Sequence, residues 1–435
     1  MANLPEDVEI ILAHDRKYKF HAAQLARGST FFSDMLSAQN AKRLGKKAEF
    51  AGINTKWVVK LTERDTDRNP AGKLELLELD DMGKPMHGTG RGMVLNENGR
   101  IPTQLFDNYE RVLYALYGNG ISYPEGDMQS VLIRSVGAIQ IAEYLGCVHT
   151  IGKPVEVALV RYGQDLFKHI QAQPWNWAQM ACRIESELIF QEAIIHLAGN
   201  WTLYSHDEDV LDTISDQIRT LCEKHHNILN DKRQKLELAV MSQYPGDLAT
   251  PSQERPIRRE EFSKDILVWM ALCFFRHYLG QRIILKKGGL SPDGGYELYK
   301  ALGTAGDAYM DKSVLNQLHA KFPVTKKAMN VVENHLLEIK ECIKGIVDAH
   351  GIMKNESQLI TPVAYLTCVE VEREDCPWVG VDDAEGGGVP LGGGRNGGRM
   401  WGNDIIKKNL SASRRLAAGA GGEEESPTRK RARNV

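Results

Sequence analysis

The sequence predicts an α+β fold: a small sheet flanked by helices, then an all-helical part, then a disordered tail. Three patterns predict it. Apolar residues alternate with a period of two in the first 20 residues, and recur every three or four residues within 155–350. After residue 386, glycine and basic residues dominate. With 435 residues, of which 42% are hydrophobic, the chain is long enough for two or three domains.

The first two strands are expected near the N-terminus. Val8, Ile10 and Leu12 alternate with other residues, and so do Tyr18 and Phe20. A period of two puts such residues on one buried face of a strand. The short polar stretch between the two runs predicts a turn, so the two strands should form a β-hairpin.

Two short helices are expected next. Leu25, Phe32 and Leu36 are separated by seven and four residues, which places them on one helical face. Gly28 followed by Ser29 interrupts the run, as a C-terminal glycine followed by an N-cap serine would. All of these features build a small core, and none of them requires a substrate.

A longer helix is expected to start at Asp107, because Glu110 three residues later completes a capping box. Gly118 should end this helix. A further helix is expected to end at Gly146. Its apolar face consists of Leu132, Val136, Ile139 and Leu145.

These N-terminal features resemble a known family, the BTB/POZ family. Its opening signature is similar to Tyr18-x-Phe20-His21 followed by Leu25, Ser29 and Phe32. A second similar segment is FDNYERVLYALYGNGISY, in which a helix ends before a short strand at residues 117–121. The resemblance covers about residues 5–150 and implies a BTB/POZ-like sheet flanked by helices.

This region departs from that family through an insertion at residues 44–104. Within it, Trp57 to Leu61 and Lys73 to Leu79 are expected to form strands. The stretches TERDTDRNPAG and MGKPMHGTGRG have the composition of loops. The insertion therefore predicts an enlarged sheet with long loops.

The remainder divides into three segments. Residues 155–350 are expected to form a helical domain, with a loop at 244–256, and residues 351–385 a short strand and loop segment. Residues 386–435 contain twelve glycines and carry a net charge of +6, so the first 385 residues carry −9. Such a segment cannot bury enough apolar surface to fold, and we expect it to be disordered.

Basic residues in this tail resemble a bipartite nuclear import signal, which predicts a location in the nucleus, the cytoplasm or both. The alternative is a solvated basic tail that only aids solubility. Weak, nonspecific nucleic-acid binding through GGGRNGGR is a further reading that the small number of arginines disfavours. The residues of the expected import signal are Arg414, Arg415, Arg429, Lys430, Arg431 and Arg433.

Composition favours an intracellular, membrane-free protein. The seven cysteines are scattered without a CxxC pair, which is typical of reduced thiols and not of a disulfide framework or zinc site. The N-terminus lacks a targeting signal. The most apolar segment, residues 266–275, has about half of the roughly 20 residues that a membrane span needs.

Several residues were weighed as chemical sites, and each has a simpler interpretation. The glycines of HGTGRGM fit a loop better than a phosphate-binding site. Cys222 and His226 lie one helical turn apart, but without a second pair of ligands a half-exposed polar helix fits better than a metal site. His21 should hold the strand–helix junction by a hydrogen bond.

The acidic run at residues 207–209 should start a helix, and Trp175 and Trp177 should close a core. The sequence therefore predicts no enzyme activity, no cofactor and no metal.

The function expected from the resemblance is protein–protein interaction. It implies a possible homodimer, and a cullin scaffold of a ubiquitin ligase or transcription factors as partners. The alternatives are a nuclear transcription-associated scaffold and, less favoured, an enzyme of unrecognised type in the helical half. The expected partner-binding residues are Phe31, Phe32, Asp34, Met35, Tyr109, Tyr114 and Tyr117.

Overall fold

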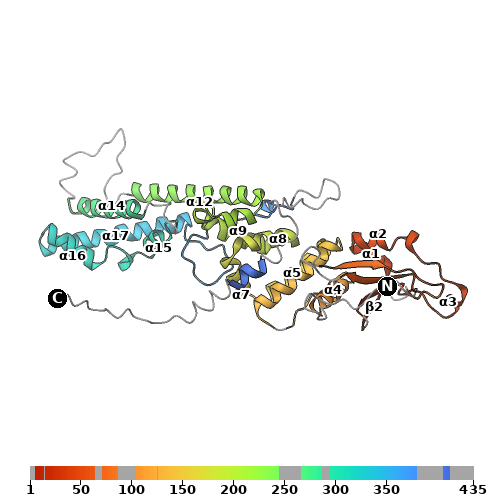
Figure 1. Ribbon diagram of the computed structural model, residues 1–435. Helices are drawn as coiled ribbons and strands as arrows, with labels where there is room; N and C mark the ends of the chain where they lie inside the picture. Colours follow the sequence, from red (N-terminus) through yellow and green to blue (C-terminus); the bar gives the residue numbers. More distant parts are fainter. Residues whose placement is uncertain are drawn as a thin grey trace, which may run out of the picture. The chain divides into compact units, whose positions relative to one another are not determined.

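The computed structural model describes most of the chain (Figure 1). The described residues are 5–13, 15–63, 71–86, 103–124, 126–243, 266–286, 294–379 and 405–411. The chain divides into two compact units. Unit 1 comprises residues 1–190 and 380–435, and unit 2 comprises residues 191–379.

Unit 1 contains a four-stranded mixed sheet in the order β2-β1-β3-β4. The strands are β1 (Val8–Ala13), β2 (Arg16–Phe20), β3 (Trp57–Glu63) and β4 (Lys73–Leu76). β1 is antiparallel to β2 and parallel to β3, and β4 is antiparallel to β3. Because parallel neighbours cannot be joined by a tight turn, the chain crosses over between β2 and β3.

The crossover consists of four short helical elements. They are α1 (Ala22–Gly28), α2 (Thr30–Met35), η1 (Ala38–Asn40) and α3 (Lys46–Phe50). The N-cap of α2 is Ser29, which accepts a hydrogen bond from a backbone N–H of the first turn at 3.1 Å. The predicted hairpin, helix pair and serine cap are therefore confirmed.

Gly28 has a different role from the one predicted. Its φ is not positive, so it does not end α1 as a left-handed cap. A Cβ at Gly28 would instead lie 2.8 Å from Cδ2 of Leu116, which shows that glycine is needed for close packing. Gly28 does end α1, as predicted, but the reason for a glycine at this position is the neighbouring Leu116 side chain.

Two longer helices, α4 (Thr103–Ala115) and α5 (Met128–Tyr144), hold the crossover in place. Ser29 Oγ donates to the carbonyl of Leu145 at 2.5 Å, and the backbone N–H of His21 donates to Tyr117 Oη at 2.7 Å. The N-terminal hairpin and helices thus pack against the residues that follow α4 and α5.

The start of α4 corrects the predicted capping box. Because α4 begins at Thr103, Asp107 and Glu110 lie inside the helix and cap nothing. Asp107 instead pairs with Arg16 at 2.5 Å, and Glu110 accepts a hydrogen bond from Tyr18 Oη at 2.9 Å. These two carboxylates tie α4 to β2.

The predicted short strand at residues 117–121 is wrong, since these residues form a turn and an extended stretch outside the sheet. Both strands predicted in the insertion are present, as β3 and β4. The second one, β4, ends at Leu76 and not at Leu79. Tyr109 Oη donates to the carbonyl of Ala71 at 2.7 Å, which connects the insertion to α4.

The rest of unit 1 is helical. It contains α6 (Val148–Val160), α7 (Gln164–Ala172), α8 (Pro174–Ile184) and a short helix at residues 405–411. α9 (Glu187–Gly199) begins in unit 1 and ends in unit 2. The helix at 405–411 corrects the prediction of a wholly disordered tail, because part of it packs on unit 1.

Residues 351–379 form a loop with one short 3-10 turn and no strand, so the strand predicted within 351–385 is not found among the described residues. Up to residue 350, unit 2 is helical in its described residues, as predicted for this part of the chain. Its elements are α10 (Trp201–Tyr204), α11 (Glu208–Thr213), α12 (Asp216–Ser242), α14 (Ile266–Lys286), α15 (Tyr296–Thr304), η3 (Gly306–Ala308), α16 (Lys312–Lys321), α17 (Lys326–His350) and η4 (Arg373–Asp375). α17 lies alongside α12, α14 and α15 (Figure 1). Its predicted apolar stripe is fully buried: Val332, Leu336, Ile339, Ile343 and Val347.

The α+β fold class is thus confirmed in its general form. Other predictions fall outside the described residues: the loop at 244–256, the glycine-rich stretch at 87–93 and all six residues of the expected import signal. The predicted domain boundaries stay a prediction. No helix among the described residues is both long enough and apolar enough to cross a membrane.

Candidate functional site

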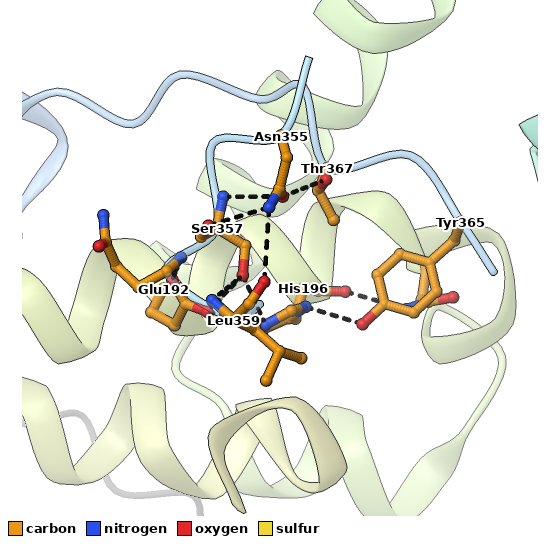
Figure 2. A network of polar contacts seen from close by, with 9 residues as sticks. Glu192, His196, Asn355, Ser357, Leu359, Tyr365 and Thr367 are labelled. Carbon is orange, nitrogen blue, oxygen red and sulfur yellow. Dashed lines mark hydrogen bonds and ion pairs between the residues drawn. The ribbon is translucent and has the colours of Figure 1, made fainter. Parts of the chain in front are cut away.

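A buried polar network in unit 2 joins α9 to the chain that follows α17 (Figure 2). Glu192 and His196 lie one turn apart on α9, and their exposed fractions are 1% and 0%. His196 Nε2 is 3.1 Å from Glu192 Oε1, and its Nδ1 is 2.7 Å from Tyr365 Oη. This geometry assigns the ring proton to Nε2, which donates to the carboxylate, while Nδ1 accepts from the tyrosine hydroxyl.

The Glu192 carboxylate is also the anchor for the loop. Ser357 Oγ donates to its Oε1 at 2.5 Å, and the backbone N–H of Gln358 donates to its Oε2 at 2.8 Å. Burial alone would raise the pKa of Glu192, but the hydrogen bonds from His196, Ser357 and Gln358 together hold it below its usual value. The carboxylate is therefore ionised at neutral pH.

The loop itself is folded by side-chain hydrogen bonds. Asn355 Oδ1 accepts from Thr367 Oγ1 at 2.7 Å and from the backbone N–H of Ser357 at 3.2 Å. Asn355 Nδ2 donates to the Ser357 carbonyl at 3.1 Å. Residues 355–367 thus reach α9 as a preformed loop, and we call this loop with Glu192 and His196 the polar clasp.

The polar clasp contains serine, histidine and glutamate, the residue types of a hydrolytic triad, in a different arrangement. A catalytic histidine accepts the serine proton, with the acid on its other nitrogen. Here His196 Nε2 already donates a hydrogen bond to Glu192. Ser357 Oγ lies 3.5 Å from this Nε2 and donates its own hydrogen bond to the Glu192 carboxylate. The geometry fastens the loop to α9 and leaves no base for Ser357.

The sequence analysis missed the polar clasp. The available signal was a glutamate and a histidine spaced by four within the otherwise apolar stretch of α9, where an unpaired charge would be costly. The partners on the loop lie more than 160 residues further along the chain. No local pattern connects them.

α12 is a half-exposed polar helix, as predicted, and Cys222 and His225 lie on its buried face. His225 Nε2 lies 3.0 Å from Asp375 Oδ2, and Lys224 Nζ lies 2.7 Å from the other oxygen. Burial lowers the pKa of His225, and the Asp375 carboxylate opposes that shift only in part. In the described part of the chain, no group of three or more possible metal ligands occurs.

Other residues weighed in the sequence have structural roles. His21 Nδ1 lies 3.2 Å from Tyr117 Oη, in agreement with a role at the strand–helix junction. Asp207 is the N-cap of α11. Trp177 is fully buried, as predicted, whereas Trp175 is partly exposed.

The seven expected partner-binding residues are divided between core and surface. Phe32 and Tyr109 are fully buried in the core of unit 1. Asp34 and Tyr114 are exposed. The other three are partly buried: Phe31, Met35 and Tyr117. Only the exposed members present a surface, and partner binding through this set stays a prediction.

In the helical core of unit 2, Lys340 on α17 is a buried cation, 3% exposed. Its Nζ donates to the carbonyls of Gly306 at 2.6 Å and Met310 at 3.2 Å. Met310 has a φ of +47° and Ala305 a φ of +56°, a conformation that non-glycine residues rarely adopt. Burial lowers the pKa of Lys340. The ammonium group therefore holds a strained turn between α15 and α16.

Large apolar side chains are exposed on the described residues of α14 to α17, among them Ile266 at the start of α14, which is 52% exposed. Phe322, which follows α16, is 61% exposed, and Leu337 on α17 is 51% exposed. Near Phe322 the surface is basic, with exposed lysines at 321, 326 and 327. Phe322 is therefore an exposed aromatic side chain with positive charge on both sides of it in the sequence.

The decisive comparison concerns this same helical part. Residues 245–350 match the FF domain in its fungal form. FF domains bind other proteins, so the general expectation of an interaction role is supported. The structure describes residues 266–286 and 294–350 of the matched range, which contain α14 to α17.

The BTB/POZ assignment is wrong, because the family comparison finds an FF domain at residues 245–350 and not a BTB/POZ domain. The signature residues that suggested it are explained by packing: Phe20, Leu25 and Phe32 are buried, and Ser29 caps a helix. Any hairpin followed by two packed helices needs residues of these types. A cullin scaffold and a homodimer, expected from that resemblance, are not supported.

No curated protein and no solved structure matches the chain.

Proposed function

We propose that this chain is a scaffold for protein–protein interaction and that its FF-like helical part binds the partner. The match of residues 245–350 to the FF domain is the observation that carries the proposal. The proposed surface surrounds Phe322, the most exposed aromatic side chain described within the matched range.

The chemistry of this surface indicates the kind of partner. Phe322 offers an apolar ring for a pocket, which is how aromatic residues contribute most to binding energy. Lys321 ends α16, and Lys326 and Lys327 begin α17, so the ring is surrounded by positive charge. The partner segment would therefore be acidic with an apolar position.

The buried polar groups of unit 2 favour binding over catalysis as the role of this part. In the polar clasp, the Glu192 carboxylate and the His196 imidazole are hydrogen-bonded to each other, and the carboxylate also accepts hydrogen bonds from the loop. Lys340 is committed to two carbonyls. We therefore propose that the helical half is not an enzyme.

Affinity purification of the tagged full-length chain from its own cells, quantified by mass spectrometry, tests the proposal. Phe322→Ser should reduce at least one copurified protein about fivefold or more, as loss of an interface anchor does. Asn334→Ser, an exposed polar position on α17, is the matched control and should change nothing. Equal recovery with both variants would contradict the proposal.

A nuclear location is a second part of the proposal, and it would suit a transcription-associated scaffold. The basic residues at 414–415 and 429–433 support it through their bipartite spacing. Replacing Arg429, Lys430 and Arg431 with alanine in a full-length fluorescent fusion should reduce the nuclear fraction. If the variant and the parent chain were distributed alike, the tail would not be an import signal.

A further inference from the structure

The helix at residues 405–411, with the sequence IIKKNLS, is bound to unit 1 through one face. Ile405 is 1% exposed and Asn409 is 0% exposed, and a spacing of four puts both on the same side. Lys407 and Ser411 are exposed. The buried side chains of this segment therefore lie against unit 1, and its exposed side chains face away from it.

Three buried side-chain donors of unit 1 hold the bound helix, two from helices α5 and α8 and one from the residue between α7 and α8. Gln129 of α5 donates to the carbonyl of Ile406 at 3.2 Å. Gln173, between α7 and α8, donates to the carbonyl of Lys408 at 2.7 Å. Trp177 of α8 donates its indole N–H to Asn409 Oδ1 at 3.3 Å. All three donors are less than a tenth exposed.

This receptor surface is pre-arranged. Asn176 Nδ2 donates to Gln173 Oε1 at 2.7 Å, so the Gln173 amide is oriented with its N–H groups toward the helix. Asn409 is held in turn by a bond from its Nδ2 to the Ile405 carbonyl at 2.8 Å. Fixed donors that meet backbone carbonyls and one asparagine are the features of a peptide-binding site.

Ser411 is placed where a modification would disturb this binding. Its hydroxyl donates to the Lys408 carbonyl at 2.7 Å, the same carbonyl that accepts from Gln173. Ser411 is the last described residue of the helix, and it is exposed. The basic residues Lys407 and Lys408 precede it, a charge pattern that suits the acidic cleft of a basic-directed serine kinase.

We propose that residues 405–411 are an internal peptide ligand of unit 1 and that phosphorylation of Ser411 releases them. A serine kinase would transfer the γ-phosphoryl group of ATP to Ser411 Oγ: the new O–P bond forms, the bond from the γ-phosphorus to the bridging oxygen breaks, and ADP leaves. The hydroxyl proton goes to the catalytic base of the kinase. This regulation lies in unit 1 and does not depend on the function proposed for the FF-like part.

The physical consequence is the loss of the docked state. The phosphoserine oxygen no longer donates to the Lys408 carbonyl, and roughly two negative charges stand beside that carbonyl oxygen, which repels them. Attraction to Lys407 and Lys408 is a weaker opposing effect, because exposed pairs at these spacings contribute little and basic-before-acidic order is the less favourable one. The kinase captures the undocked form, and the phosphate then keeps it undocked.

Hydrogen–deuterium exchange of the full-length chain tests the release. Phosphorylation of Ser411, verified by mass spectrometry, should raise exchange at residues 405–411 about fivefold or more. Asn409→Ala should do the same without a phosphate. Ser413→Glu, which adds charge two residues further along the chain, should leave exchange at residues 405–411 unchanged. If phosphorylated and unmodified chains exchanged equally at 405–411, the switch would be overturned.

A peptide experiment tests the groove independently of that result. A labelled peptide of residues 403–413 should bind the full-length Asn409→Ala variant, whose own segment is released, more tightly than the parent chain. The same peptide with phosphoserine at 411 should bind the variant about fivefold more weakly or worse. Equal binding of the peptide to variant and parent, or of both peptides to the variant, would overturn the proposal. Circular dichroism melting confirms that the variant is folded.

Discussion

Two segments near the C-terminus are fastened to helices in different ways, one in each unit. In unit 2 the loop at 355–367 is held by an ionised carboxylate and an imidazole, both completely buried. In unit 1 the helix at 405–411 is held by neutral amide and indole donors. The difference shows that a contact made by buried charged groups costs much free energy to break. A contact made by neutral hydrogen bonds, which contribute about 1 kcal/mol each, can open reversibly.

The largest effect is expected at the polar clasp. Glu192→Ala should lower the free energy of unfolding of unit 2 by about 3–5 kcal/mol, because it leaves the His196, Ser357 and Gln358 donors buried without their acceptor. Urea denaturation combined with hydrogen exchange of α9 measures it. Glu223→Ala, an exposed change on α12, is the control and should stay within about 0.5 kcal/mol. A small effect of Glu192→Ala would show that buried charge does not distinguish the two fastenings.

Lys340 is the intermediate case, a buried charge that binds neutral carbonyls. Lys340→Met should lower the free energy of unfolding of unit 2 by about 1–3 kcal/mol, since the carbonyls of Gly306 and Met310 lose their donor. Lys327→Met on the same helix is exposed and should be neutral. If the two variants had equal stability, the strained turn at 305–310 would not depend on the ammonium group.

The histidines of α12 predict that the stability of unit 2 depends on pH. The neutral donors that hold the helix at 405–411 in unit 1 predict no such dependence. Burial lowers the pKa of both His225 and His226 in the folded state, so the unfolded chain binds more protons. Their stabilisation is therefore present above about pH 6.5 and is lost as pH falls below it. The pKa of Asp375 is lowered, so its own loss comes at more acidic pH.

The measurement is urea denaturation of the full-length chain at pH 7, 6 and 5, with exchange of α12 as the local readout. Replacing His225 and His226 with glutamine should flatten the decline. An unchanged slope in that variant would assign the pH dependence to other groups.

The smallest effect is expected at the docked helix. Trp177→Phe keeps an aromatic ring in the core but removes the indole donor to Asn409. It should cost about 1 kcal/mol and raise exchange at residues 405–411 about fivefold, with α9 unaffected. Arg111→Lys, a change on α4, is the control within unit 1. No change in exchange would mean that the hydrogen bond from Trp177 to Asn409 does not help to hold the helix.

The sequence predicted what is encoded locally. The hairpin follows from alternation in β1 and β2, the α2 cap from Ser29, and the buried stripe of α17 from its three- and four-residue spacing. Each of these depends on residues within one or two turns of one another. Local pattern is therefore enough to predict them.

The remaining features depend on distant partners. Asp107 and Glu110 look like a cap until β2 supplies Arg16 and Tyr18, about 90 residues earlier. The helix at 405–411 is hidden in a glycine-rich tail, and the donors that hold it lie on α5, on α8 and between α7 and α8. Contacts between residues far apart in the sequence determine these structures, so the spacing of residues along the chain is not enough to predict them.

The central claim is that the FF-like helical part, and not unit 1, contacts the partner protein. Cross-linking mass spectrometry of the full-length chain with its copurified proteins tests this most directly. The account predicts intermolecular cross-links at Lys321, Lys326 and Lys327, and their loss in Phe322→Ser. Intermolecular cross-links confined to lysines of unit 1, such as Lys17 and Lys19 on β2, would contradict it.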